Sequence, residues 1–491
     1  MAGNILVKDL TFKYLSMIHP IFKNVDLNIH ENWKLGLVGR NGRGKTTFFH
    51  LLLNELEHEG SIQSSLRFKY FPSLPSEDEK MLTLDVLLQH NPHIEVWEIE
   101  KELAGMDLSS EILYKHFHQL SGGEQTKVLL IELFLNEEVF PLIDEPTNNL
   151  DLKGRKIVGE YLKNKRGFIV ASHDEAFLNQ CISHVLAINK NSIDLISGNI
   201  DTWKYEKTNA DLLAEETNQQ LKTEIKRLNT VSRRVNDWGN RRENSTKDAS
   251  ERRMAAKQMK RAKAIQKRTE GLMKEKQNLI QNVEKTSELK MVISKPRNQL
   301  LFFRDFTIMR DNRPLFQPIS LDMYPEDRLF IEGENGAGKS TFLKFILGME
   351  NLEVRGEYNI CLPEHLSVLH QKNNENQDYL SMLRKLSTKA DKEEYWHILH
   401  QLGIERSKFT NQISATWSAG QQKKTFLANA LLGKNELFVW DEVTNYLDLT
   451  VIHQLIQAIH TYKPSMIGID HNEVYVNAVA TKKIMLLPSE R

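Results

Sequence analysis

Residues 39–46 have the composition and spacing of a loop that binds phosphate groups. Gly39, Gly44, Lys45 and Thr46 occupy the fixed positions of the pattern GxxxxGK[ST]. The glycines let backbone N–H groups approach phosphate oxygens, Lys45 can reach the β and γ phosphates of a nucleotide, and the Thr46 hydroxyl can bind Mg²⁺. The other predicted nucleotide contacts of this loop are Asn41, Gly42 and Thr47.

Two adjacent carboxylates, Asp144 and Glu145, follow an apolar run at 139–143. They allow a division of labour in which Asp144 holds the metal ion, usually through water, and Glu145 orients or deprotonates an attacking water. His173 follows a second apolar run at 167–170 and can contact the γ phosphate, although a lone histidine is most often structural. The pattern therefore favours hydrolysis of a nucleotide.

Two further features extend the predicted nucleotide site. Ser121, Gly122 and Gly123 open a predicted helix, and the glycines present backbone donors to an anion. Tyr14 ends an early strand-like stretch, where its ring either stacks on adenine or packs into a core.

The second half of the chain repeats this series of motifs. Lys339 follows Lys45 by 294 positions, and Asp441 follows Asp144 by 297. We therefore predict two nucleotide-binding units in tandem. The predicted nucleotide contacts of the second phosphate loop are Gly333, Asn335, Gly336, Gly338, Lys339, Ser340 and Thr341. The residues that correspond to the segment from Ser121 are Ser418, Gly420 and Gln421. The predicted metal ligands are Ser340, Gln371 and Asp441, and the predicted catalytic residues are Glu442 and His471.

Apolar runs must place these motifs at strand ends. The run at 35–38 predicts a buried strand that leads through the phosphate loop into a helix at 47–53, and the runs at 139–143 and 167–170 predict further strands. The predicted class is α/β. The predicted domains are a first unit at 1–205, a linker at 206–290 and a second unit at 291–491.

The linker has helical periodicity in two segments. Apolar residues recur in steps of three or four from Leu221 to Trp238 and again from Met259 to Val283. Gly239 and Asn240 begin the predicted break between them. Two antiparallel helices of about 35 residues, at about 1.5 Å per residue, would project about 50 Å.

The linker also carries an excess of positive charge. From 222 to 268 there are 16 Lys or Arg against 5 Asp or Glu, whereas the whole chain balances at 65 each. One interpretation is a solvated coiled coil, and the other is a surface that binds a polyanion by releasing counterions. The candidate contacts are Arg233, Arg234, Trp238, Arg241, Arg242, Lys247, Arg252, Arg253, Lys257, Lys260, Arg261 and Lys263.

The bulk composition favours a soluble, multidomain protein. The 491 residues suffice for two or three cores. No apolar run approaches the roughly 18 residues of a membrane helix, and the first residues lack a signal region. Two cysteines provide neither a disulfide framework nor a metal site. We expect a reducing cytoplasm.

Together, the phosphate loop, the sequence LSGGEQ, the sequence DEPTNNLD and the histidine resemble the nucleotide-binding cassette of an ATP-binding cassette (ABC) protein. The resemblance implies ATP and Mg²⁺ as cofactors and a head-to-tail pair of cassettes within a monomer. Lys45 would then face Ser418 and Gly420, and Lys339 would face Ser121 and Gly123.

Several positions depart from the cassette pattern. Ala419 replaces a signature glycine, Ser73 stands where a glutamine usually ligates the metal, Arg310 replaces Tyr14 in the second copy, and Val443 replaces a proline. Glu145 and Glu442 are both present. We therefore expect two working but unequal sites.

Tandem cassettes joined by a charged helical hairpin resemble the ABC-F family, and the stretches 32–45 and 259–265 resemble its antibiotic-resistance branch, the Lsa and Vga type. The resemblance implies a 70S ribosome partner. The ATP-bound protein would occupy the E site, contact 23S rRNA and P-site tRNA, and displace lincosamides, streptogramins A or pleuromutilins. The predicted tip at 238–250 is short, which favours displacement through tRNA and rRNA.

Two alternatives differ in class. A general translation factor would relieve stalled ribosomes without drug, but the cassettes lack room for the arm helices of such members. A DNA-associated ATPase would also join cassettes by a helical hairpin, but those coiled coils are far longer and lie within one cassette.

Overall fold

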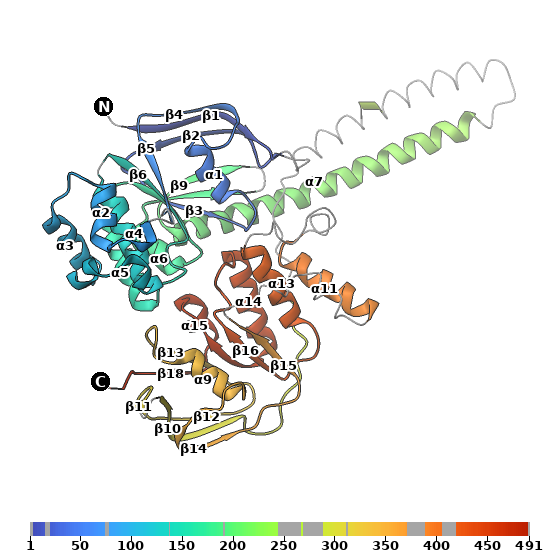
Figure 1. Ribbon diagram of the computed structural model, residues 1–491. Coiled ribbons are helices and arrows are strands. Elements are labelled where there is room, and N and C mark those ends of the chain that lie inside the picture. Colours follow the sequence, from blue (N-terminus) through green and yellow to red (C-terminus); the bar gives the residue numbers. More distant parts are fainter. Residues whose placement is uncertain are drawn as a thin grey trace. The chain divides into compact units, whose positions relative to one another are not determined.

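The computed structural model describes residues 3–14, 20–73, 78–136, 138–189, 192–243, 267–268, 288–310, 313–370, 388–404 and 419–489. Contacts divide the chain into two units, Met1–Ile200 with Thr286–Arg491 and Asp201–Lys285. The unit Met1–Ile200 with Thr286–Arg491 holds both motif copies, the earlier one coloured from blue to green and the later one from yellow to red (Figure 1). The domain boundaries at 205 and 290 stay predictions.

The first copy is built on a six-stranded sheet of order β5-β6-β7-β3-β8-β9. Its first five strands in this order are parallel, and β9 is antiparallel to β8. Buried strand centres explain the continuous apolar runs, so the predicted strands at 35–38, 139–143 and 167–170 are confirmed. The strands are β3 (Lys34–Gly39), β5 (Arg67–Phe71), β6 (Val139–Asp144), β7 (Phe168–Ala171), β8 (His184–Ile188) and β9 (Ile193–Ser197).

A second sheet and one helix complete this core. The antiparallel sheet has the order β2-β1-β4, formed by β1 (Asn4–Phe12), β2 (Phe22–His30) and β4 (Glu59–Ser64). Helix α1 (Lys45–Leu52) buries Phe48 and Phe49 in a cluster shared with both sheets. The remaining helices are α2 (Thr83–His90), α3 (Val96–Gly105), α4 (Gly122–Leu135), α5 (Leu152–Lys163) and α6 (Glu175–Cys181), with 3₁₀ turns η1 (Asp78–Lys80), η2 (Ser110–Tyr114) and η3 (Phe117–Gln119).

The second copy repeats this plan. Its parallel sheet has the order β15-β16-β17-β13-β18, and β10 pairs with β11, β12 and β14 in an antiparallel sheet. The strands are β10 (Leu301–Arg310), β11 (Arg313–Pro314), β12 (Ile319–Met323), β13 (Arg328–Glu332), β14 (Val354–Ile360), β15 (Leu366–Leu369), β16 (Leu437–Asp441), β17 (Ser465–Ile469) and β18 (Lys482–Met485). The helices are α9 (Lys339–Ile346), α11 (Lys389–Gln401), α13 (Ala419–Leu431), α14 (Leu449–Tyr462) and α15 (Glu473–Val479).

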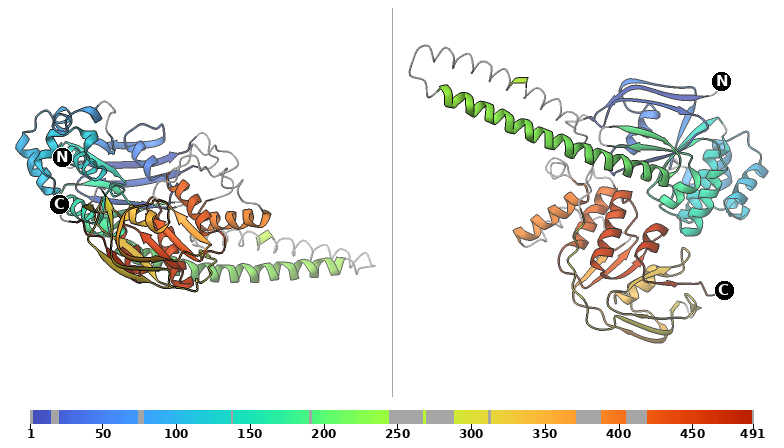
Figure 2. Two further views of the ribbon diagram at one scale, coloured as in Figure 1. Left: turned by 60° about the horizontal axis from the view of Figure 1, so that its bottom comes forward. Right: turned by 180° about the vertical axis from the view of Figure 1, so that it is seen from behind.

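One 44-residue helix, α7 (Ile200–Glu243), forms most of the described part of the linker. The predicted start of the break at Gly239 and Asn240 is wrong, because α7 runs through both residues. Both views show this green helix as continuous (Figure 2). An interior glycine costs about 1 kcal/mol relative to alanine, which does not stop a helix by itself. Except for 267–268, the predicted second linker helix lies outside the described residues.

Candidate nucleotide-hydrolysis site

The phosphate loop of the second copy joins β13 to α9 and is folded around its own lysine. Gly336 and Gly338 have φ of 85° and 90°, and a Cβ at Gly338 would lie 2.5 Å from the Leu315 side chain. Lys339 Nζ donates hydrogen bonds to the carbonyl oxygens of Gly333 at 2.7 Å and Glu334 at 3.0 Å. Burial lowers the pKa of Lys339. The loop therefore holds a buried ammonium group at a helix N-terminus, a favourable arrangement for anions.

A hydroxyl and a carboxylate lie together at the end of β16. Ser340 Oγ donates to Asp441 Oδ2 at 3.3 Å, and Asp441 Oδ1 is buried without a hydrogen-bond partner. Burial raises the pKa of Asp441. Mg²⁺ takes oxygen ligands and commonly uses one or two carboxylates with substrate phosphates and waters, so these oxygens fit that ion. The predicted ligand Gln371 lies outside the described residues.

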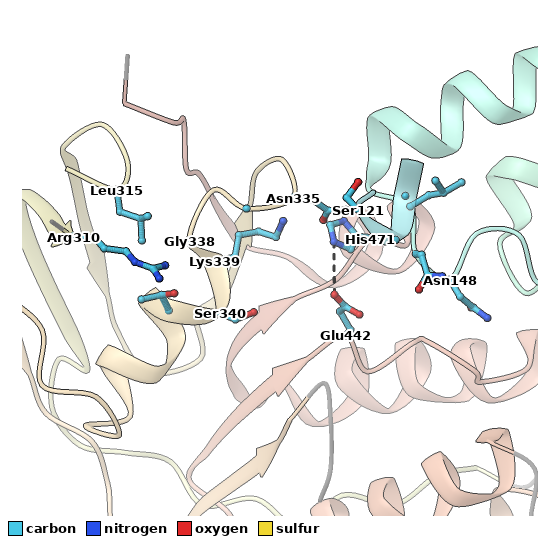
Figure 3. A pocket seen from close by; sticks show the side chains of 16 residues that line it. Ser121, Asn148, Arg310, Leu315, Asn335, Gly338, Lys339, Ser340, Glu442 and His471 are labelled. Carbon is cyan, nitrogen blue, oxygen red and sulfur yellow. Dashed lines mark ion pairs between the residues drawn. The ribbon is translucent and has the colours of Figure 1, made fainter. Parts of the chain in front are cut away.

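Glu442 follows Asp441 in a strained backbone conformation. Its φ is 50°, and its N–H donates to the Ile469 carbonyl at 2.7 Å. Glu442 Oε1 lies 3.9 Å from His471 Nε2 (Figure 3). Burial, assisted by the Lys339 charge, lowers the pKa of His471 to about 3, so the imidazole is neutral at pH 7. A carboxylate and a neutral histidine thus converge beside Lys339.

A cavity of about 530 Å³ joins this site to the first copy. One wall is the phosphate loop of the second copy, and the opposite wall is the N-terminus of α4 (Figure 3). Lys339 therefore faces Ser121 and Gly123 across the cavity, and Arg310 lines it too. The lining residues are Ser121, Gly122, Gly123, Asn148, Asn149, Leu150, Arg310, Leu315, Asn335, Gly336, Gly338, Lys339, Ser340, Thr341, Glu442 and His471.

The phosphate loop of the first copy has the same internal geometry with one difference. Lys45 Nζ donates to the Gly39 carbonyl at 2.9 Å and lies 3.2 Å from His173 Nε2. Burial and the Lys45 charge hold the pKa of His173 well below its usual value. An ammonium group only donates, so Nε2 of this neutral histidine is the acceptor. In the second copy, Lys339 donates instead to two backbone carbonyls.

Glu145 has the geometry of Glu442, with φ of 49° and its N–H donating to the Ala171 carbonyl at 2.8 Å. Its Oε1 lies 3.3 Å from His173 Nε2 but accepts no hydrogen bond. Burial raises the pKa of Glu145 to about 8, against the opposing charge of Lys45. A carboxylate with a pKa near neutrality suits a general base.

The sequence pattern missed one group at the metal-facing carboxylate of the first copy. Asp144 Oδ2 accepts hydrogen bonds from Thr46 Oγ1 at 2.8 Å and from the Tyr70 hydroxyl at 3.1 Å. Burial and the charge of Asp144 raise the pKa of Tyr70. Tyr70 is the next-to-last residue of β5, three positions before Ser73, and its place near the end of a parallel strand was the available signal. Tyr14 contacts the same loop, with its hydroxyl 3.1 Å from Thr47 Oγ1.

Each phosphate loop also contacts an aspartate of the other copy. Asn41 N–H donates to Asp448 Oδ2 at 3.1 Å, and Asn335 N–H donates to Asp151 Oδ2 at 3.3 Å. Asn41 Nδ2 also donates to the Tyr446 carbonyl at 2.7 Å. Each phosphate loop is therefore bonded to the aspartate at the equivalent position of the other copy.

Of the predicted residues 418, 420 and 421, the structure describes Gly420 and Gln421 but not Ser418. Gly420 lies against Asn41, since a Cβ there would be 2.3 Å from Asn41 Nδ2, and Gln421 Nε2 would lie 3.7 Å from a Cβ at Gly42. Ser418 and the side chain of Ala419 are outside the described residues, so the Lys45–Ser418 pairing stays a prediction. The same holds for the side chains of Arg233, Arg234, Trp238, Arg241 and Arg242, and for Lys247, Arg252, Arg253, Lys257, Lys260, Arg261 and Lys263.

Comparison with known proteins identifies similar chains along nearly the whole length. The family model described as ABC transporter matches residues 22–148 and 316–445. The ribosome protection protein VmlR of Bacillus subtilis (strain 168) is 24% identical over 95% of this chain and 84% of its own length. The uncharacterized ABC transporter ATP-binding protein YfmM of the same organism is 26% identical over 97% of both. The ATP-binding protein Uup of Buchnera aphidicola subsp. Acyrthosiphon pisum (strain APS) is 27% identical over 94% of this chain and 77% of its own.

Solved structures share the tandem fold. A crystal structure of the archaeal ribosome recycling factor aABCE1, in complex with the archaeal ribosomal stalk protein aP1, covers 97% of this chain and 87% of its own, with a TM-score of 0.60 and 16% identity. The structure named RNase-L Inhibitor covers the same shares with a TM-score of 0.59. Among the helices that the structure describes, none is long and apolar enough to cross a membrane.

Proposed function

This chain belongs to the ABC transporter family, and from that premise we propose that it is a ribosome-associated ATPase of the ABC-F type that protects ribosomes from antibiotics. The chain is an ATPase, and its cofactors are ATP and Mg²⁺. The observation that carries the proposal is the pairing of two cassettes, with Lys339 and Ser121 across one cavity, in a chain similar throughout to VmlR.

The two sites supply the chemistry of hydrolysis through their own side chains. Thr46 with Asp144, and Ser340 with Asp441, would hold Mg²⁺, which neutralises phosphate charge when bound. Glu145 and Glu442 would orient the attacking water and accept its proton. Their neutral neighbours His173 and His471 would contact the γ phosphate. Hydrolysis at Lys339 would need both walls of the cavity, so it would require the cassettes to be closed.

The proposed partner is the 70S ribosome. We propose that the ATP-bound chain occupies the E site beside P-site tRNA and that the linker reaches toward the peptidyl-transferase centre. The excess of positive charge between 222 and 268 supports a polyanionic partner such as 23S rRNA. Displacement of a lincosamide, streptogramin A or pleuromutilin would follow from a shift of tRNA or rRNA, and hydrolysis would release the protein.

The test is a chain that closes on ATP but does not hydrolyse it. Glu145→Gln with Glu442→Gln keeps the shape of both side chains and removes both bases. We expect this variant to co-sediment with 70S ribosomes in the presence of ATP and not in the presence of ADP. Lys45→Ala with Lys339→Ala is the matched control, which should not bind in either nucleotide. A glutamine variant that sediments free of ribosomes with ATP contradicts the proposal.

A general translation factor is the second candidate, because relatives such as YfmM and Uup have names that do not mention protection. Growth of a sensitive host that expresses the chain, over a panel of peptidyl-transferase inhibitors, separates the two candidates. A raised inhibitory concentration for at least one drug class supports protection. Equal inhibitory concentrations, together with ribosome binding, support the general factor.

A further inference from the structure

One buried arginine links the two histidine segments of the paired cassettes. Arg155 lies in the first turn of α5, and its side chain is 9% exposed. Its Nη1 donates to Asp174 Oδ2 at 2.8 Å and to the backbone carbonyl of His471 at 3.1 Å. Its Nε donates to the Leu150 carbonyl at 3.1 Å. One guanidinium therefore joins the residue after His173 to His471 itself.

Among the residues that the structure describes, the second copy shows no equivalent of this link. By the offset of the motifs, Ile452 stands at the position of Arg155, and Asn472 stands at that of Asp174. Ile452 is buried and apolar, and Asn472 caps α15 by accepting a hydrogen bond from the Tyr475 N–H at 3.0 Å. An apolar side chain cannot donate to a carbonyl, so the position of Ile452 cannot provide the reciprocal bond to His173. In the described part of the chain, the connection therefore runs from the first copy to the second and not the reverse.

The segments joined by Arg155 also bear on the second site by other contacts. Asp151, four residues earlier, accepts from the N–H of Asn335 in the second phosphate loop. Asp174 is tied to its own cassette, since its N–H donates to Ser172 Oγ at 3.1 Å and that hydroxyl contacts Thr147 Oγ1. A displacement of the segment 172–174 would therefore move the donor to which the His471 carbonyl is bonded.

We infer that Arg155 is a positioning residue that couples the histidine segment of the first cassette to His471, so that the first site controls hydrolysis at the second. The planar guanidinium holds several donors in a fixed geometry, which suits simultaneous bonds to Asp174 and a carbonyl. Without it, the His471 backbone loses a charged donor and the imidazole is less well placed beside Glu442. The inference rests on hydrolysis at the two proposed sites and is independent of the ribosome.

The test copies into the first cassette the pair that the second already has. Arg155→Ile alone would leave Asp174 buried and unpaired, which is strongly destabilising, so Arg155→Ile is combined with Asp174→Asn. Hydrolysis is measured in Glu145→Gln chains, where only the second site turns over, and in Glu442→Gln chains, where only the first does. At the second site we expect kcat to fall about tenfold with KM for ATP within about twofold, and at the first site kcat to change less than about twofold.

A readout independent of turnover is hydrogen–deuterium exchange of the otherwise unaltered chain. Exchange should become faster in residues 470–473 of the paired variant and stay unchanged in the core strand β16. Arg155→Lys keeps an ammonium beside Asp174 and should restore part of the lost kcat. Equal losses of kcat at both sites, or unchanged exchange at 470–473, would overturn the inference. Failure of the Glu145→Gln, Glu442→Gln variant to bind ribosomes with ATP would overturn only the proposed function.

Discussion

At the residue scale, the two glutamates are held in a backbone conformation that few side chains adopt. Glu145 and Glu442 have φ of 49° and 50°, and each N–H bonds to the neighbouring strand. Strain of this kind, about 1–3 kcal/mol, persists where the surrounding structure fixes it, as at functional sites. The environments of the two glutamates nevertheless differ, because a lysine–histidine contact lies beside Glu145 and not beside Glu442.

Burial of Glu145 makes the stability of the nucleotide-free chain depend on pH. The folded-state pKa of about 8 lies above the ordinary value of 4.5, so the stabilisation from the protonated form is complete below about pH 4.5 and is lost as pH rises through 8. Relative to the Glu145→Gln variant, the free energy of unfolding of the unaltered chain should fall by on the order of a few kcal/mol between pH 5 and 8.5. Denaturant unfolding at both pH values measures this. Glu138→Gln, at a side chain that is 80% exposed, is the control.

Tyr70 should assist the use of metal at the first site. Tyr70→Phe removes one of the two hydroxyl donors to Asp144 Oδ2 and leaves Thr46 in place. In a Glu442→Gln chain, we expect this substitution to raise the Mg²⁺ concentration for half-maximal hydrolysis about fivefold. That factor corresponds to one hydrogen bond of about 1 kcal/mol. Tyr161→Phe, whose hydroxyl bonds to Glu102 instead, is the matched control. An identical Mg²⁺ dependence in both variants would remove Tyr70 from the site.

At the scale of elements, two pairs of helices carry contacts between the cassettes. Lys156 on α5 pairs with Glu473 on α15 at 2.6 Å, and His453 on α14 contacts Glu175 on α6 at 2.8 Å. These two contacts are related by the motif repeat, one with lysine and the other with histidine. Ile452 stands at the position equivalent to Arg155, so among the described residues the interface combines repeated contacts with one that only the first copy provides.

An ion pair between α13 and α14 provides a stability prediction at this scale. Lys424 and Asp448 are 2.6 Å apart with side chains only 3% and 1% exposed. Burial alone would raise the pKa of Asp448, but the Lys424 charge outweighs it and holds the pKa well below its usual value. Asp448→Asn should destabilise the fold by about 3–5 kcal/mol, because it removes the carboxylate that pairs with the buried Lys424 ammonium group. Denaturant unfolding measures this change.

The first copy offers the comparison. Asp151 has the position of Asp448, but the equivalent Lys127 donates to the Met106 carbonyl instead. Asp151→Asn should therefore lower the free energy of unfolding far less than Asp448→Asn does. Combining Lys424→Met with Asp448→Asn should recover most of the stability that Asp448→Asn loses. Equal destabilisation by the two asparagine variants would show that the buried pair is not the cause.

Local patterns predicted the strands and motif loops because each depends on a few adjacent residues. The run at 139–143 and the pair Asp144–Glu145 could be read directly, since a buried parallel strand is uniformly apolar. Arg155 could not, because its partner His471 is 316 positions away and no spacing marks the contact. Tyr70 was missed for a similar reason. The break predicted at Gly239 was wrong because the rest of α7 has enough helix-favouring sequence for the helix to continue through this glycine.

At the scale of the whole molecule, the linker should be separable from hydrolysis. Replacing residues 238–250 by a short Gly–Ser loop removes the end of α7 and the predicted tip but no residue of either cassette. We expect drug protection in a sensitive host to be lost while ATP hydrolysis by the purified chain stays within about twofold, since its barrier is set at the cassettes. Undiminished protection would exclude the tip from the mechanism.

Because α7 is one continuous helix, its residue count sets both its length and the direction in which the residues at its far end point. Its 44 residues correspond to about 66 Å at 1.5 Å per residue, and each added residue also turns the far end by about 100°. Four inserted residues would carry that end about 6 Å further and rotate it by about 40°, whereas seven would add about 10 Å and nearly restore its facing. Reach and azimuth can therefore be tuned separately by insertion length.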